Sequence, residues 1–239
     1  MADGTPARAW RVVLEKIESD LLAGKLGPGD RLPSERDLVA QLGVGRSSVR
    51  EALRVLEVMG LIRTATGSGP SAGAIVVARP TGGMQALLRL QVAAQGFAIS
   101  DVVNTRLLLE EWVAGELAGS SDVDLERARE ALRAMDAPGL SPADFLALDA
   151  QFHVALAEAS GNEVVAAMMA GLRSSIEDYV LEGAARIPDW NSTVDRLRDE
   201  HNAIVVAIDE RRVADARTAV RDHITGYYAS ANPVRPESA

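Results

Sequence analysis

The feature that constrains this chain most is residues 31–62, which read as two short helices joined by a tight turn. Ser34 suits the N-cap of the first helix, and Gly43 suits its end, where the backbone can turn left-handed. The second helix has apolar residues spaced three and four apart, which predicts one buried face. These residues are Val49, Ala52, Leu53, Leu56 and Met59. Arg46 and Arg50 lie outside that face, as docking in the major groove of DNA requires. A plain helical hairpin with a solvated basic face is the alternative.

The segments on both sides of this helix pair predict the rest of a DNA-binding domain. Upstream, apolar residues from about position 7 to 23 follow a helical period, which predicts a helix that packs behind the pair. Downstream, two short extended runs, 63–66 and 74–77, flank a turn rich in glycine. This pattern predicts a β-hairpin wing, and the alternative is a flexible linker. The favoured interpretation is a winged helix-turn-helix domain over residues 1–79.

Three ordered motifs carry a specific resemblance. They are P-S-E-R-x-L from Pro33, L-G-V-x-R-x-x-V-R-E-A-L from Leu42, and L-x-x-x-G-L-I from Leu56. Together they resemble the winged helix-turn-helix of the GntR family of bacterial transcription regulators. The resemblance implies that DNA is contacted by Arg36, Arg46, Ser47, Ser48 and Arg50 and, at the wing tip, by Gly67.

The chain departs from the family pattern at two places. The family usually has Ser or Thr where this chain has Gly45, so the hydroxyl that caps the second helix and meets the DNA backbone is missing. Glycine still caps a helix, with a loss of roughly a few tenths of a kcal/mol. The glycine-rich loop at 67–73 is longer than usual and lacks the aromatic residue of the family's wing motif.

The charge of the chain is unevenly divided. The net charge is −9, yet residues 1–79 contain 11 Lys and Arg against 9 Asp and Glu, so the acidity belongs to the second half. This division excludes a protein that coats nucleic acid and favours recognition by a few placed arginines. The absence of cysteine excludes disulfides and thiolate metal sites. The sequence has no apolar stretch long enough to span a membrane, so we expect a soluble cytoplasmic protein.

Residues 80–83 break the pattern and predict a linker, after which the chain has a helical period almost to its end. Breaks at glycine, serine and proline divide this region into about seven helices. They span residues 84–95, 99–119, 122–136, 142–160, 162–184, 191–210 and 213–230. Short connections predict an antiparallel all-α bundle over residues 84–231, followed by a disordered tail at 232–239. The predicted fold class is therefore mainly α.

All three histidines of the chain lie on predicted helices of this bundle. They are His153, His201 and His223. Asp149 precedes the first by four residues, so the two side chains share one helix face, about 40° apart. A carboxylate and three neutral imidazoles suit a divalent ion such as Zn²⁺, Ni²⁺ or Mn²⁺. On spacing alone, hydrogen-bonded core residues remain the alternative.

Further motifs resemble the FCD effector domain of the FadR subgroup in the same family. They are L-D-x-x-F-H-x-x-L-x-x-A-S-G-N from Leu148, and the segments around Glu200-His201 and Ala216–Ile224. The resemblance implies a divalent metal, with zinc expected first and nickel or manganese as alternatives. Its ligands would be Asp149, His153, His201 and His223. Arg106, in an R-x-x-L-E pattern, would turn inward and bind the carboxylate of an effector; the alternative is a surface ion pair with Glu110.

These features predict a transcription regulator and not an enzyme. A homodimer would place two recognition helices in successive major grooves, which implies a pseudo-palindromic operator in double-stranded DNA. A small carboxylic acid in the bundle would shift the population between DNA-competent and DNA-incompetent states, with repression as the default. Two alternatives are a regulator that senses the metal itself and a metalloenzyme. For the metalloenzyme, no residue near the ligands suggests a general base.

Overall fold

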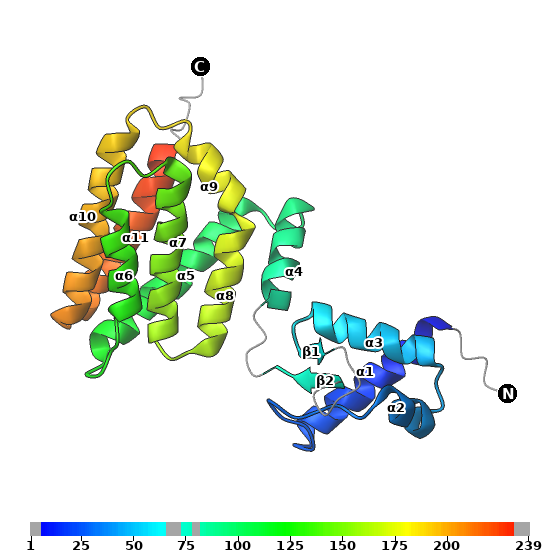
Figure 1. The fold of residues 1–239 in the computed structure, drawn as a ribbon. Coiled ribbons are helices and arrows are strands. Elements are labelled where there is room, and N and C mark those ends of the chain that lie inside the picture. Colours follow the sequence, from blue (N-terminus) through cyan, green and yellow to red (C-terminus); the bar gives the residue numbers. More distant parts are fainter. Residues whose placement is uncertain (1–5, 66–72, 78–81, 232–239) are drawn as a thin grey trace. The chain divides into compact units, whose positions relative to one another are not determined.

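A computed structural model describes residues 6–65, 73–77 and 82–231. Contacts divide the chain into two units, Met1–Ala86 and Leu87–Ala239 (Figure 1). Each unit has its own core. The division falls within helix α4 (Gly82–Ala93). The predicted linker at 80–83 therefore lies partly outside the described residues and partly at the start of this helix. The predicted tail at 232–239 lies outside the described residues.

In its described part, the N-terminal unit contains three helices and a two-stranded sheet before α4. They are α1 (Pro6–Leu22), α2 (Glu35–Leu42), α3 (Arg46–Val58), β1 (Ile62–Ala65) and β2 (Gly73–Val76). α1 packs on α3, and apolar side chains from the three helices and both strands form one core. Its most deeply buried members are Val13, Ile17, Leu38, Val49 and Ala52. This core supports the α2–α3 pair that the sequence predicts.

The local signals of the helix pair act as predicted. The Ser34 hydroxyl accepts a hydrogen bond from the Asp37 amide at 3.2 Å and donates one to the Asp37 carboxylate at 2.6 Å. Gly43 ends α2 with a φ of 65°, a left-handed conformation that suits glycine. Gly45 begins α3 without a side-chain cap. One expectation is wrong: Met59 is 50% exposed, because α3 ends one residue before it and the buried stripe does not continue.

The two strands form an antiparallel hairpin next to α3. Their register places Ile62 opposite Val76, and the predicted hairpin is confirmed. Glu57 on α3 accepts a hydrogen bond from the Thr64 amide at 3.0 Å, which fixes β1 against this helix. The turn between the strands, with the predicted DNA contact Gly67, lies outside the described residues.

The C-terminal unit is an all-α bundle, as predicted (Figure 1). After α4, its helices are α5 (Ile99–Gly119), α6 (Glu126–Met135), α7 (Pro142–Ala159), α8 (Glu163–Ser175), α9 (Glu177–Ala184), α10 (Trp190–Asp209) and α11 (Val213–Ala231). The described residues from 82 onward thus form eight helices instead of about seven, because segment 162–184 divides at Ile176. Ile176 leaves the helical conformation while its side chain is buried against Val102 and Leu172. Packing sets this break, since no glycine or proline stands there.

Helix pairs in the bundle bring distant parts of the chain together. α5 packs along α11, α6 along α7, and α10 along α11. Large apolar side chains fill the space between them, among them Leu117, Phe145, Phe152, Met169 and Ile204. The same packing turns ionisable side chains of α5, α7, α8, α10 and α11 toward the interior. Within the described ranges, no helix is both long enough and apolar enough to span a membrane.

Candidate metal centre and DNA-binding surface

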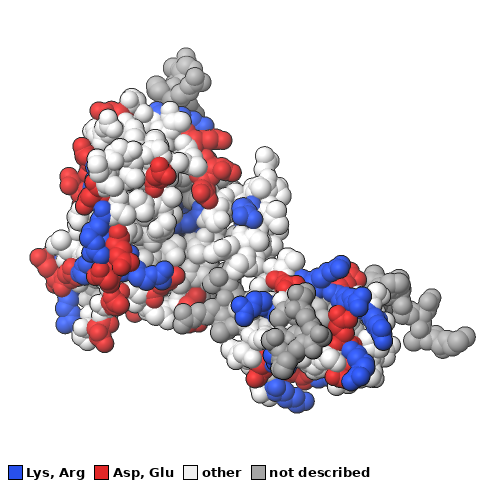
Figure 2. Space-filling model, in the orientation of Figure 1, with Lys and Arg blue, Asp and Glu red and all other residues white. Residues whose placement is uncertain are grey.

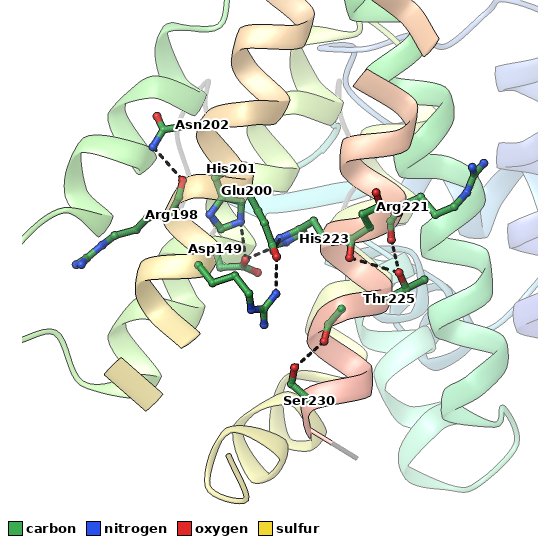
Figure 3. Close-up of polar contacts among 12 residues, drawn as sticks. Asp149, Arg198, Glu200, His201, Asn202, Arg221, His223, Thr225 and Ser230 are labelled. Atoms are coloured by element: carbon green, nitrogen blue, oxygen red, sulfur yellow. Dashed lines mark hydrogen bonds and ion pairs between the residues drawn. The ribbon is translucent and has the colours of Figure 1, made fainter. Parts of the chain in front are cut away.

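Four potential metal ligands meet in the interior of the bundle. Figure 3 labels three of them, Asp149, His201 and His223. Asp149 and His153 lie one turn apart on α7, His201 lies on α10, and His223 lies on α11. All four are buried, and one potential ligand atom from each lies within 4.8 Å of the others. The predicted ligand set is thus brought together from three helices.

The distances among these atoms suit a shared ion. His201 Nε2 lies 3.0 Å from Asp149 Oδ1, and the Nε2 atoms of His153 and His223 each lie 3.7 Å from the same oxygen. These two Nε2 atoms lie 3.1 Å from each other. Zinc binds nitrogen and oxygen at about 2.0–2.2 Å, so ligand atoms around one tetrahedral ion are roughly 3.3–3.6 Å apart. These four separations bracket that range, and all pairs in the set lie within 4.8 Å.

Two carboxylates hold the opposite side of two imidazole rings. Glu110 of α5 contacts His153 Nδ1, and Glu200 Oε2 lies 2.9 Å from His223 Nδ1. A carboxylate at Nδ1 favours the tautomer with the proton on that nitrogen, which leaves the Nε2 lone pair free. Two lone pairs that face each other at 3.1 Å repel unless a proton or a cation lies between them. This pair of nitrogens therefore accommodates either a shared proton or a divalent ion, and the nitrogen and oxygen donors around it suit the ion.

The electrostatics of the site keep Asp149 charged and His201 neutral. Burial raises the pKa of Asp149, but the charge of Arg173 and the contacts with His153 and His201 outweigh it and hold that pKa well below its usual range. Burial and the neighbouring His223 lower the pKa of His201 to about 4. A neutral imidazole beside an ionised carboxylate is the state that binds a metal.

Arg106 is turned into the bundle. Its Nε and Nη2 lie 3.0 and 2.9 Å from Glu110 Oε1, and Nη1 donates to the Tyr228 hydroxyl at 2.8 Å. The ion pair with Glu110 that the sequence allows is present, but it is buried instead of lying at the surface. Burial raises the pKa of Glu110, but the neighbouring His153 and Arg106 lower it by more. The net effect is a lowered pKa, so Glu110 is ionised.

A second buried arginine lies beside the ligands. Arg173 of α8 places Nη1 2.6 Å from Asp149 Oδ2, and its Nη2 lies 3.8 Å from Glu110 Oε2. Its Nε is buried without a hydrogen-bond partner. Nothing in the spacing of the sequence separates Arg173 from the other arginines of the bundle, so only the structure identifies it.

The predicted DNA contacts lie at the start of α2 and along α3. The exposed ones are Arg36, Arg46, Ser47 and Arg50. Ser48 is only 8% exposed, so its hydroxyl offers DNA little surface. The Arg50 side chain lies 3.0 Å from Glu35 of α2. Figure 2 shows basic side chains along the part of this unit that α3 occupies in Figure 1.

Comparison with protein families assigns both units. Residues 11–70 match the family of bacterial regulatory proteins named gntR, and residues 101–226 match the FCD domain. The FCD match alone spans more than half of the chain. The chain belongs to the GntR family. Its C-terminal unit is an FCD domain, and its N-terminal unit is the DNA-binding domain of a GntR regulator.

Known regulators resemble this GntR chain over most of its length. The HTH-type transcriptional repressor NanR of Cronobacter sakazakii is 30% identical, with 92% of this chain and 84% of NanR covered. The Glc operon transcriptional activator of Escherichia coli K12 is 30% identical, with 89% of this chain and 85% of the activator covered. A solved GntR structure from Streptococcus agalactiae aligns with a TM-score of 0.63 and 25% identity over 92% of this chain and 97% of that one. The GntR chain is a transcription regulator.

Proposed function

We propose that this GntR regulator binds a pseudo-palindromic operator as a homodimer. A small carboxylic acid, bound beside a divalent metal in the FCD domain, controls that binding. The observation that carries the proposal is the convergence of four potential ligands in a bundle that the chain joins to a DNA-binding domain. We assign the metal to Asp149, His153, His201 and His223. We assign DNA contact to Arg36, Arg46, Ser47, Arg50 and Gly67, and leave out Ser48 because it is buried.

Zinc is the metal that the ligand set favours. Imidazole nitrogen and carboxylate oxygen both suit zinc. Nickel and manganese accept ligands of these types and are the alternatives. A bound divalent ion supplies a positive centre that attracts a carboxylate.

The charge balance of the interior favours an anionic effector. The ionised groups pair as Arg106 with Glu110, Arg173 with Asp149, and Arg196 with Glu200. A divalent ion therefore adds two positive charges to a balanced network, and uncompensated buried charge is unfavourable. A carboxylate would neutralise part of this charge. It would also accept a hydrogen bond from the unpartnered Nε of Arg173.

Arg106 is the second anchor that we propose for the effector. Glu110 holds its Nε and Nη2, whereas Nη1 bonds to the neutral hydroxyl of Tyr228. A charged carboxylate is a stronger acceptor than a hydroxyl, so an effector would replace Tyr228 at Nη1. Because Tyr228 lies on α11, its release would change the packing of the helix that also carries His223.

Apolar surface on α5 supports a homodimer. Leu108 is 74% exposed, and Trp112 lies one turn further along the same exposed stripe. Large apolar side chains grouped on one face suit a helix that packs against a second copy of the chain. Two DNA-binding domains in one dimer match the two half-sites of a pseudo-palindromic operator.

We take repression released by the effector as the direction of regulation. NanR is named a repressor, which supports this direction, whereas the Glc operon relative of equal identity is named an activator. In either direction, the effector has to bind the DNA-competent and DNA-incompetent states with unequal affinity. Equal affinity would leave the population unchanged.

A regulator that responds to the metal alone is the second candidate. The observation that favours it is the small size of one cavity beside the ligands. A cavity next to Glu110 and His153 has a volume of about 10 Å³, enough for one water molecule. In this alternative, loss of the metal changes operator affinity without any acid.

A thermal-shift screen against small carboxylic acids, with and without chelation of the metal, separates the two candidates. Stabilisation by an acid that disappears after chelation supports the effector site. Metal-dependent stability without a response to any acid supports metal sensing. If chelation leaves the unfolding temperature unchanged, and loss of the metal has been verified, the metal assignment fails.

The division of labour between the two units is tested by Arg50→Ala. Loss of this guanidinium should abolish operator binding in a mobility-shift assay, because it removes a proposed groove contact. Metal content and stabilisation by acids should stay at the wild-type level, since their proposed ligands lie in the other unit. Loss of all three properties in a folded variant would contradict the assignment.

A further inference from the structure

We propose that Glu200 is a positioning residue of the metal site. It holds the His223 ring in the tautomer and orientation that direct Nε2 toward the ion, and it thereby sets how tightly the ion is bound. This inference rests on the proposed metal site and goes beyond it, because Glu200 is not a ligand itself.

The two oxygens of Glu200 have separate partners. Oε2 lies 2.9 Å from His223 Nδ1 (Figure 3), and Oε1 contacts Arg196, one turn earlier on α10. Arg196 therefore stabilises the rotamer that presents Oε2 to the imidazole. On the other side of its ring, His223 places Nε2 3.7 Å from Asp149 Oδ1 and 3.1 Å from His153 Nε2.

An ordinary ion pair on a helix surface would leave Glu200 in solvent. A pair four residues apart needs no third partner and contributes little to stability. The Glu200 side chain is only 25% exposed, and its inner oxygen faces a histidine that is 4% exposed. An ionised carboxylate only accepts hydrogen bonds, so it selects the His223 tautomer with the proton on Nδ1.

The site contains a second contact of the same kind and one ring without it. Glu110 contacts His153 Nδ1, whereas His201 Nδ1 is buried without a hydrogen-bond partner. The two rings held by carboxylates are the pair whose Nε2 atoms face each other at 3.1 Å. Both lone pairs can point at one ion only if both rings keep their Nδ1 protons. Glu110 and Glu200 together supply this condition.

Glu200 is the better of the two carboxylates to test. Removal of Glu110 would leave the buried guanidinium of Arg106 without its ionic partner, which is strongly destabilising. Glu200 lies at the edge of the cluster, and its partner Arg196 has a side chain that is 36% exposed. When its carboxylate partner is removed, the charge of Arg196 is therefore less deeply buried than that of Arg106, whose side chain is 6% exposed.

The experiment compares Glu200→Ala with Glu111→Ala as a matched control. The Glu111 side chain is 19% exposed and pairs with Arg221 of α11 instead of a proposed ligand. The Zn²⁺ affinity of the full-length variants is measured by competition with a chromophoric chelator. The visible absorption of the Co²⁺-loaded proteins reports the ligand field, and circular dichroism confirms that each variant is folded.

We expect Glu200→Ala to weaken Zn²⁺ binding about 10- to 100-fold and to alter the Co²⁺ spectrum. Glu111→Ala should change the affinity by less than about twofold, because its partner Arg221 is 51% exposed and contacts no proposed ligand through this pair. Glu200→Gln keeps an oxygen that accepts a hydrogen bond from Nδ1, so it should recover part of the affinity and the wild-type Co²⁺ spectrum.

Wild-type Zn²⁺ affinity in Glu200→Ala would overturn the proposal. An equal loss in Glu200→Ala and Glu111→Ala would also overturn it, because the effect would then be general. His201→Ala separates this failure from failure of the metal site: if that variant also binds Zn²⁺ like the wild type, the ligand assignment itself is wrong.

Discussion

At the scale of single residues, the contact between Arg50 and Glu35 bears most directly on how DNA sequence is recognised. The Arg50 Nε donates to Glu35 at 3.0 Å, which orients the guanidinium and leaves its terminal nitrogens for a base edge. We expect Glu35→Gln to reduce the preference for operator over unrelated DNA several-fold. Binding to unrelated DNA should strengthen, because a negative charge leaves the surface. Fluorescence anisotropy with both DNAs at one salt concentration measures this ratio.

Glu51→Gln is the matched control for that variant. Glu51 is exposed next to Arg50 on α3, so its substitution removes the same charge from the same surface. It should strengthen binding to both DNAs alike and leave their ratio unchanged. If the two variants alter the ratio equally, the effect of Glu35 is one of charge alone and not of orientation.

The meeting of Asp149 with the three histidines could be predicted from sequence, whereas the partners of these residues could not. Asp149 and His153 are one helical turn apart, and the chain contains only three histidines. Arg173 reaches Asp149 across 24 residues, and Glu200 reaches His223 across 23. These contacts depend on which faces of α8, α10 and α11 meet, and helical periodicity in a bundle does not determine how two faces are paired.

At the scale of secondary structure, the start of α3 lacks a side-chain cap that the backbone could accommodate. Gly45 has φ −72° and ψ 154°, an extended conformation open to any residue, and an added Cβ would lie 3.7 Å from Ser47 Oγ. We expect Gly45→Ser to cap α3 and to stabilise the protein by roughly a few tenths of a kcal/mol. Operator affinity should rise more clearly, because the hydroxyl can also donate to a phosphate. Urea denaturation and mobility-shift titration measure the two effects.

Gly45→Ala distinguishes the hydroxyl from the added carbon atom. Its methyl group fits the same space, but alanine caps a helix less well than glycine. This variant should therefore lose stability and gain no operator affinity. A gain in affinity equal to that of the serine variant would show that the hydroxyl plays no part.

The helix ends show which elements a sequence determines locally. Ser34 and Gly43 delimit α2 through contacts within a few residues, so their roles follow from residue type. The break between α8 and α9 has no such signal, because Ile176 leaves the helix to pack against Val102 and Leu172. Local chemistry therefore predicted the DNA-binding unit closely, and long-range packing decided the number of helices in the bundle.

At the scale of the whole molecule, the two cores divide the chain into parts with different ligands. All four proposed metal ligands lie in Leu87–Ala239, so chelation should lower the unfolding temperature of the FCD domain and leave that of the N-terminal unit unchanged. A ligand at about 1,000 times its Kd contributes about 4 kcal/mol, and this corresponds to a shift of roughly 10 °C for a domain of this size. Differential scanning calorimetry of the full-length protein, with and without chelator, tests this expectation.

Asp149→Ala identifies which calorimetric transition belongs to the metal. Without chelator, the FCD domain of this variant should already unfold at the temperature of the chelated wild type. Adding chelator should not change that temperature. The fluorescence of Trp10 follows the N-terminal unit in a Trp112→Phe/Trp190→Phe background, because the other two tryptophans lie in the FCD domain. If chelation shifts the Trp10 transition by the same amount as the FCD transition, the two units unfold cooperatively. Metal binding would then also stabilise the DNA-binding unit.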